Sequence, residues 1–158
     1  MRKLVLAISG IALSVIFISS CGKKSVFSEY KSIDAEKGWA KDNRISFDVN
    51  IDDTISRYNV YVNVRQGDVY QFRNLFVFLV TEYPDGRKVK DTLECLLADD
   101  KNQWMGEGAG DLWDNTIPFK GNAKFPVKGK YKFTYEQAMR VDPLPMIKDM
   151  GLTIDKAE

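Results

Sequence analysis

The sequence predicts an all-β protein, an antiparallel β-sandwich of the immunoglobulin-like or jelly-roll type preceded by a lipoprotein signal peptide. Apolar and polar residues alternate at period two from about residue 30 onward, and β-branched and aromatic residues are concentrated in the alternating segments. No run of helical spacing is long enough to compete with this pattern. About seven short strands separated by turns are typical of two packed antiparallel sheets.

The composition excludes several functional classes. The chain has 158 residues and no histidine, so a catalytic imidazole or a histidine-based zinc site is excluded. Lys and Arg number 23 against 22 Asp and Glu, which gives no basic surface for a nucleic-acid backbone. The length fits one domain. The motifs considered below lead us to expect no cofactor and no metal, and the family resemblance given last implies a protein that is not an enzyme.

The first twenty residues form an export signal. Arg2 and Lys3 precede an uncharged, mostly apolar run from Leu4 to Ile18, which is shorter than the roughly 20 residues that a membrane-spanning helix needs. The run is followed by Ser19-Ser20-Cys21, which resembles the bacterial lipobox. We therefore predict cleavage before Cys21 and lipidation of Cys21 as the mature N-terminus.

Lipidation predicts a permanent membrane anchor, because bacterial lipoproteins carry two or three acyl chains and each buried methylene adds about 0.8 kcal/mol. Gly22, Lys23 and Lys24 follow the lipidated residue, so an inner-membrane retention aspartate and an acidic surface-display cluster are both absent there. The predicted location is the periplasmic leaflet of the outer membrane. The expected organisation is a signal peptide at 1–20, the lipidated cysteine and a tether at 21–29, and one sandwich domain at 30–158.

The first half of the domain contains three expected strands. Residues 45–51 and 58–64 alternate strictly and predict half-buried strands. Residues 75–80 (Leu-Phe-Val-Phe-Leu-Val) are apolar at every position, which indicates a central strand covered on both faces. Tyr83 to Gly86 then supplies a turn, because Pro84 presets its backbone and Gly86 accepts a positive φ.

The second half contains a return strand, a second hairpin and a short last strand. The return strand, 88–97, places Cys95 in its apolar phase, which Asp91 interrupts. Cys95 is the only other cysteine, so we expect a buried, unreactive thiol and no intrachain disulfide. The second hairpin joins 123–126 to 131–135 through a turn at 127–130, and the last strand is 151–155. Gln137 continues the inward phase, so its amide should be buried and bonded to backbone where the strand ends.

The segment 99–115 is rich in glycine, acids and tryptophan, and we expect a surface connection there. A phosphate loop is excluded because the glycines neither follow a parallel strand nor open a helix. A calcium site and a paired-carboxylate glycosidase site are alternatives, although the spacing matches no EF-hand loop. The acids concerned are Asp99, Asp100, Glu107, Asp111 and Asp114.

The two tryptophans of this segment, Trp104 and Trp113, have two interpretations. They can pack over the end of the sandwich, with their N–H groups bonded to carbonyls. Alternatively, together with Asp111 and Asp114 they can form a surface on which a sugar ring stacks, as in carbohydrate-binding modules. The second interpretation predicts a glycan-binding or partner-binding site.

Several irregular motifs, in order and at compact spacing, resemble the gliding-motility lipoproteins of the GldH type. The resemblance covers the mature chain, most densely from Tyr58 to Ile154, and includes the lipobox. Its motifs are Tyr83-Pro84-Asp85-Gly86 with Asp91-Thr92-Leu93-Glu94, Gly106-Glu107-Gly108-x-Gly110-Asp111 with Trp113-Asp114-Asn115, Phe125-Pro126-x-x-Gly129-x-Tyr131, and the stretch from Tyr131 to Pro145 followed by Gly151-Leu152-Thr153-Ile154. One departure is Met146, which follows Pro145 where the family pattern has a glycine.

The resemblance implies an outer-membrane lipoprotein required for gliding in Bacteroidetes, associated with the motility apparatus and its linked protein-secretion system. It implies no catalytic residue. The expected partners are the membrane, through the lipid on Cys21, and other envelope motility or secretion proteins, but no nucleic acid. The leading hypothesis is thus a non-enzymatic structural or assembly component. The alternative is a periplasmic glycan-binding lipoprotein that uses the loop tryptophans.

Overall fold

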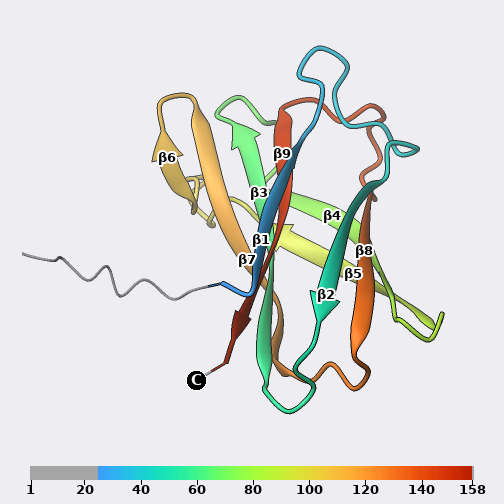
Figure 1. Cartoon of the computed structure of the whole chain (residues 1–158). Helices are drawn as coiled ribbons and strands as arrows, with labels where there is room; N and C mark the ends of the chain where they lie inside the picture. Colours follow the sequence, from blue (N-terminus) through green and yellow to red (C-terminus); the bar gives the residue numbers. More distant parts are fainter. Residues whose placement is uncertain (1–24, 158) are drawn as a thin grey trace, which may run out of the picture.

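The computed structural model describes residues 25–157, which form two antiparallel sheets packed face to face (Figure 1). The described chain contains nine strands. Their bounds are β1 Phe27–Ser32, β2 Ile45–Ile51, β3 Tyr58–Gly67, β4 Asn74–Glu82, β5 Lys88–Leu96, β6 Glu107–Ala109, β7 Leu112–Ala123, β8 Gly129–Gln137 and β9 Ile147–Lys156. The predicted all-β sandwich is confirmed. Across residues 25–157, no helix of a length and apolarity suited to crossing a membrane was found.

The two sheets have five and four strands. The five-stranded sheet has the order β1-β9-β3-β7-β6, and the four-stranded sheet has the order β2-β8-β4-β5. The connections gather at two ends. We call the end formed by loops 52–57, 83–87 and 124–128 the proximal end, because β1 begins beside it, and the end formed by loops 33–44, 68–73, 97–106 and 138–146 the distal end.

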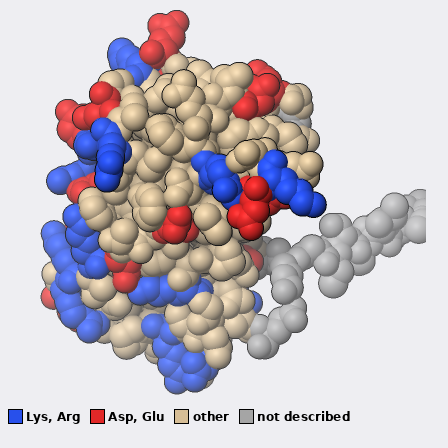
Figure 2. All heavy atoms as spheres, turned by 180° about the vertical axis from the view of Figure 1, so that it is seen from behind, with Lys and Arg blue, Asp and Glu red and all other residues tan. Residues whose placement is uncertain are grey.

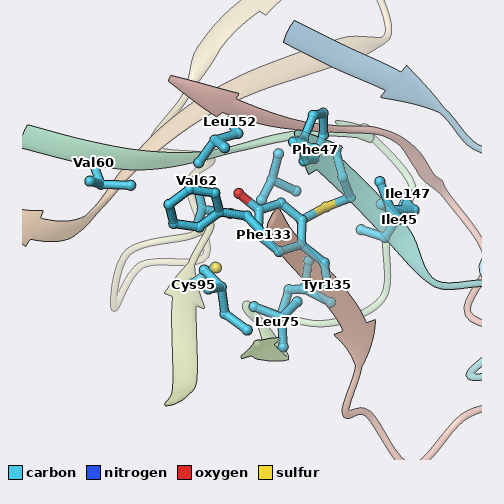
Figure 3. Packing of buried hydrophobic residues seen from close by; sticks show 14 of the residues in the cluster. Ile45, Phe47, Val60, Val62, Leu75, Cys95, Phe133, Tyr135, Ile147 and Leu152 are labelled. Carbon is cyan, nitrogen blue, oxygen red and sulfur yellow. The ribbon is translucent and has the colours of Figure 1, made fainter. Parts of the chain in front are cut away.

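The core lies between the sheets because period-two alternation directs every second side chain inward. Figure 3 shows Phe133 and Tyr135 of β8 between Leu152 and Val62 of the five-stranded sheet and Cys95 of the four-stranded sheet. The Tyr135 hydroxyl donates to the Gly151 carbonyl at 3.2 Å and so links the sheets by a buried hydrogen bond.

Two predictions about single core residues are confirmed. Cys95 is 0% exposed, and burial raises the pKa of its thiol to about 12, so the thiol is protonated at neutral pH. Gln137 is also buried and lies at the last position of β8. Its side-chain amide donates to the Val141 carbonyl at 3.0 Å, and its Oε1 accepts the Met139 N–H at 2.9 Å.

The prediction that residues 75–80 are covered on both faces is wrong. Along β4 the residues alternate between buried and half-buried. Leu75, Val77 and Leu79 face the core, whereas Phe76 and Phe78 lie on the outer face of the four-stranded sheet. The Lys90 ammonium covers Phe78 at 4.0 Å from the ring centroid, so a cation and not a further layer shields this ring. The strand is nevertheless internal, between β8 and β5.

The predicted hairpin between 123–126 and 131–135 is also wrong. β7 ends at Ala123 and pairs with β3 in the five-stranded sheet, whereas β8 pairs with β2 and β4 in the other sheet. Residues 124–128 therefore cross from one sheet to the other. Phe125 in this crossing is buried against Tyr58 and Tyr131, which explains the apolar residue that suggested a strand.

The strands at the chain ends are longer than the alternation predicts. β1 begins at Phe27, inside the segment expected to be a tether, and pairs along its length with β9. β9 begins at Ile147 and not at Gly151. Met146, just before β9, has φ 67°, a left-handed conformation that favours glycine, the residue type that the sequence resemblance led us to expect there.

The two sides of the sandwich, where the sheet edges approach one another, are closed by polar links. Lys120 of β7 pairs with Asp91 of β5 at 3.1 Å, and Lys31 of β1 donates to the Ser46 carbonyl of β2 at 2.5 Å. Asp91, the residue that interrupts the apolar phase of β5, is an inward-phase charge on an edge strand. Such a charge discourages edge-to-edge association.

Candidate functional site

Trp104 lies at the distal end and packs against the domain. It pairs with Ala98 in an isolated antiparallel bridge and is half-buried against the core. Its ring centroid lies 6.5 Å from that of Tyr70, at an interplanar angle of 39°. These contacts agree with the packing interpretation of this indole.

Trp113 and Asp114 are consecutive residues of β7, so their side chains point to opposite faces of the sheet. The six-membered ring of Trp113 lies against Gly108 of β6, where an added Cβ would approach the ring carbons to 3.0 Å. Glycine at 108 therefore lets the indole cover the β6–β7 hairpin. Asp114 bonds with Arg65 on the outer face of the five-stranded sheet.

Asp111 is exposed in the tight turn between β6 and β7, beside Gly110 at φ 68°. Its carbonyl accepts the Asp68 N–H at 2.9 Å. Trp104, Trp113, Asp111 and Asp114 therefore do not converge on one face of the sandwich. The predicted surface connection at 99–115 contains the β6–β7 hairpin, which begins at Glu107.

The acids of the calcium alternative are engaged separately. Asp99 accepts the backbone N–H groups of Lys101 at 2.8 Å and Gln103 at 2.9 Å, while Asp100 pairs with Arg73 at 2.8 Å. Within residues 25–157, no three His, Cys, Asp or Glu side chains are grouped so that they could hold a metal ion. The geometry thus offers no support for the calcium alternative.

A polar cleft of about 410 Å³ lies beside the start of β6, where β7 continues past Asp114 without a β6 partner. Its polar lining includes Tyr30, Glu107, Asp114, Asn115 and Thr116. Tyr30 is 44% exposed, and its ring lies over Gly151, where an added Cβ would come within 2.9 Å of the ring. The cleft thus combines an accessible aromatic ring with carboxylate, amide and hydroxyl groups.

Arg65 organises the floor beside the cleft. Its guanidinium holds Asp114 in two hydrogen bonds, of 2.7 and 3.2 Å, and approaches Asp149 at 3.4 Å. The hydrogen bond with Asp114 raises the pKa of Arg65, and partial burial, with the Asp114 charge next, raises the pKa of Tyr30. Both carboxylate oxygens of Asp114 are thus occupied, which leaves Glu107 as the free carboxylate at the rim among the described lining residues.

Two buried amides lie behind the cleft. The Asn115 amide donates to Gln66 Oε1 at 2.7 Å, and the Gln66 side chain is 0% exposed. The Gln66 Nε2 group has no hydrogen-bond partner among the described residues. A buried amide of this kind costs free energy unless a water bonds it.

A second candidate region lies on the outer face of the four-stranded sheet near the distal end. We call Phe72, Phe76, Leu96, Met139 and Val141 the distal apolar surface. A mainly apolar hollow of about 290 Å³ lies among Phe72, Phe76, Met139 and Val141, and an adjoining hollow extends to Leu96. Leu96 is 53% and Val141 41% exposed. Exposed apolar groups gathered in this way are typical of protein contact sites.

Charged groups frame the distal apolar surface. Arg140 lines the larger hollow and Arg73 the adjoining one, where Arg73 pairs with Asp100. The larger hollow is therefore mainly apolar and has Arg140 at its rim, whereas the adjoining hollow also carries Glu94, whose Oε1 accepts the Asn74 amide at 2.7 Å. The larger hollow suits a protein segment that offers an apolar side chain beside a carboxylate.

Sequence reasoning missed Tyr30, Arg65, Asn115 and the distal apolar surface. Tyr30 lies in a segment where apolar and polar residues do not alternate, so no strand was expected there. Arg65 lies between two inward-facing positions of β3, so it was expected only to face outward. The apolar run at 75–80 was a usable signal, because Phe76 is apolar in the outward phase. Cys21, the predicted lipidation site, lies outside the described residues.

The comparisons with known proteins agree with each other. The family model described as GldH lipoprotein matches residues 25–154. The "Gliding motility lipoprotein GldH homolog" of Christiangramia forsetii is 34% identical over 92% of this chain and 92% of its own length. The "Gliding motility lipoprotein GldH" of Flavobacterium johnsoniae is 38% identical over 95% of this chain and 97% of its own.

Solved structures add no argument. A chain in the structure of the infectious bursal disease virus Gx strain aligns with 94% of this chain over 35% of its own length, at 16% identity and a TM-score of 0.23. A TM-score this low carries no inference about fold or function.

Proposed function

The chain belongs to the GldH lipoprotein family, and from this premise we propose that it is a non-enzymatic assembly component of the gliding-motility apparatus and its linked protein-secretion system. Its anchor is the lipid on Cys21, at the periplasmic face of the outer membrane. The names of both curated relatives refer to gliding motility and to a lipoprotein, and neither refers to a reaction.

The observation that carries the proposal is the distal apolar surface. Its exposed members, Val141 in the larger hollow and Leu96 in the adjoining one, have no covering segment among residues 25–157, and Arg140 at the rim favours a partner with a carboxylate. Contact surfaces of protein complexes combine an apolar centre with a polar rim in the same way. We infer that another envelope protein of the apparatus binds here.

The test is a matched pair of variants in the lipidated protein. Val141→Asn places an amide in the larger hollow, whereas Val26→Asn makes the same change at a valine of similar exposure, 43% against 41%, near the proximal end. Partners retained by the parent are identified by mass spectrometry and their binding to each purified variant is measured. We expect Val141→Asn to weaken binding about tenfold or more and Val26→Asn to leave it unchanged. Equal binding by both variants contradicts the proposed surface.

Glycan binding is the second candidate, and the polar cleft is the observation that favours it. Tyr30 offers an exposed ring for stacking, and Glu107 a free carboxylate for sugar hydroxyls. This cleft differs from the site expected from the sequence, because of the four predicted residues only Asp114 lines it. Retention of the purified domain on peptidoglycan or polysaccharide, lost in Tyr30→Ala, would favour this function over the first.

A further inference from the structure

The proximal end presents one strongly exposed apolar side chain on an ordered loop. Ile55, in the β2–β3 loop, is 87% exposed. Asp53 organises this loop, because its Oδ1 accepts the N–H groups of Ile55 at 2.9 Å and Ser56 at 3.0 Å. Its Oδ2 accepts the Ser56 hydroxyl at 2.6 Å and the Lys156 ammonium at 2.8 Å. Five polar groups in all hold the loop, since the Tyr58 hydroxyl donates to the Asp53 carbonyl at 2.7 Å.

Cations lie beside this side chain. The segment 123–132 contains four lysines and no acid, and its Lys124 and Lys128 are exposed in the β7–β8 loop. The Arg57 guanidinium donates to the Asn122 carbonyl at 3.0 Å, which places it next to the same loop. In the lower part of Figure 2, blue groups outnumber red ones among the charged residues.

The acids of the proximal end offset only part of this positive charge. Asp53 is paired with Lys156, whereas Asp52 and Asp85 keep their negative charge and accept hydrogen bonds from neighbouring neutral amides. Among the described residues, neither Lys124 nor Lys128 has a carboxylate within ion-pair distance. The proximal end therefore presents the exposed Ile55 side chain together with two exposed lysines that no carboxylate pairs among the described residues.

The chain enters the domain at this same end. Phe27, the first residue of β1, pairs with Ile154, and β9 ends two residues later at Lys156, opposite Tyr58. The Ala157 N–H then donates to the Arg57 carbonyl at 2.8 Å. Six residue steps separate Cys21 from Phe27, which fully extended span about 20 Å. A lipid on Cys21 therefore keeps Phe27, at the start of β1 beside the proximal end, within about 20 Å of the bilayer.

We propose that the proximal end is a membrane-contact surface, on which Ile55 inserts into the headgroup region and Arg57, Lys124 and Lys128 bind anionic lipid headgroups. This inference rests on the proposed lipid anchor at Cys21. An apolar side chain gains by leaving water at the interface, and each lysine or arginine near an anionic surface strengthens binding by about fivefold. The contact points the distal apolar surface away from the bilayer, toward other envelope proteins.

The test uses the full lipidated chain in vesicles of phosphatidylethanolamine and phosphatidylglycerol. Ile55→Cys supplies one reactive thiol for an environment-sensitive fluorophore, since Cys95 is buried and Cys21 carries the lipid. The matched control is Val69→Cys, an apolar residue 65% exposed at the distal end. We expect the label at position 55 to shift to shorter wavelength and to be shielded from acrylamide, while the label at position 69 stays fully accessible.

Charge is tested by the pair Lys124→Glu and Lys128→Glu, with Lys101→Glu in the distal loop as control. The pair should remove most of the shielding at position 55, as should vesicles of phosphatidylcholine alone, and Lys101→Glu should not. A label at 55 as accessible as that at 69, in a chain whose acylation is verified by mass spectrometry, overturns the membrane contact and leaves the anchor standing. Absence of the acyl chains on Cys21 overturns the anchor and, with it, this inference.

Discussion

Replacing Gln137 by alanine should destabilise the domain strongly, because this amide terminates β8 inside the core. Its Nε2 donates to the Val141 carbonyl at 3.0 Å, and its Oε1 accepts the Met139 N–H at 2.9 Å. A second, longer contact of 3.4 Å reaches the Trp39 carbonyl, which also accepts the Leu144 N–H at 2.9 Å. Trp39 therefore keeps a partner in the variant, whereas Met139 and Val141 lose one each.

The magnitude follows from these two orphaned groups. A buried polar group left without a partner costs about 1 to 3 kcal/mol, so two such groups cost about 2 to 6 kcal/mol. Because the bond to Val141 is only part-buried, the lower part of this range applies, and the free energy of unfolding of Gln137→Ala should fall by roughly 2 to 4 kcal/mol. The assay is urea unfolding of the domain comprising residues 25–158. With an m-value of about 2 kcal/mol/M, the midpoint should fall by about 1 to 2 M with m unchanged.

Two further variants isolate the cause. Gln71→Ala removes an exposed glutamine from the β3–β4 loop and should change stability by less than about 0.5 kcal/mol. Gln137→Glu keeps the size and one acceptor but buries a carboxylate whose pKa must rise. Its stability should therefore be lowest at neutral pH and recover as the pH falls toward 4, where the protonated acid can donate to Val141. A Gln137→Ala domain as stable as the parent refutes the account of this strand end.

Three other predictions concern the thiol, the proximal loop and the sheet edge. Since burial raises the pKa of Cys95 to about 12, native protein should react slowly with a thiol reagent between pH 7 and 9 and quickly after urea is added; rapid stoichiometric labelling of the native domain contradicts its burial. The hydrogen bonds to Asp53, led by that from Lys156, lower the pKa of Asp53 in the folded protein. The ionised carboxylate therefore stabilises the fold above the unfolded pKa near 4, and this stabilisation is lost as the pH falls from there through the folded pKa. Acid unfolding of Asp53→Asn should depend less on pH than that of the parent, and an equal pH dependence argues against the loop bonds. Asp91→Val removes the inward charge from β5 and its pair with Lys120, so stability should change by about 1 kcal/mol or less while self-association, measured by light scattering, increases; a variant that stays as monodisperse as the parent contradicts the protective role of Asp91.

The alternation of apolar and polar residues predicted those strands that bury one face and expose the other. In β2 and β8 buried residues alternate with less buried ones, so both strands, and Gln137 at the end of β8, could be placed from the sequence. β1 could not, because it is an edge strand exposed at nearly every position and carries no alternation. Its position depends on pairing with β9, more than a hundred residues later.

The candidate sites depended on contacts that the sequence does not encode locally. The Arg65 cluster joins β3, β7 and β9, and Tyr30 reaches it across Gly151. Nothing in the spacing of these residues indicates that they meet. By contrast, the glycines and acids of 99–115 suggested one binding site, but the segment contains the β6–β7 hairpin. Trp113 and Asp114 are adjacent strand residues there, so their side chains point to opposite faces of the sheet and cannot share one binding surface.

The most direct test of the central claim separates the lipid from the domain in a living cell. In a gliding bacterium that lacks its own copy and in which the lipidated chain restores spreading, the native signal and Cys21 are replaced by a non-lipidated export signal at equal abundance. Among residues 25–157 the buried core runs from Ile33 to Ile154, with Phe27 packed against it, and the exported domain retains all of these residues, so it should fold. The account predicts that spreading is not restored, since the anchor supplies the effective concentration near membrane-bound partners. Full spreading with the soluble form would contradict the anchored assembly role and favour a diffusible glycan-binding one.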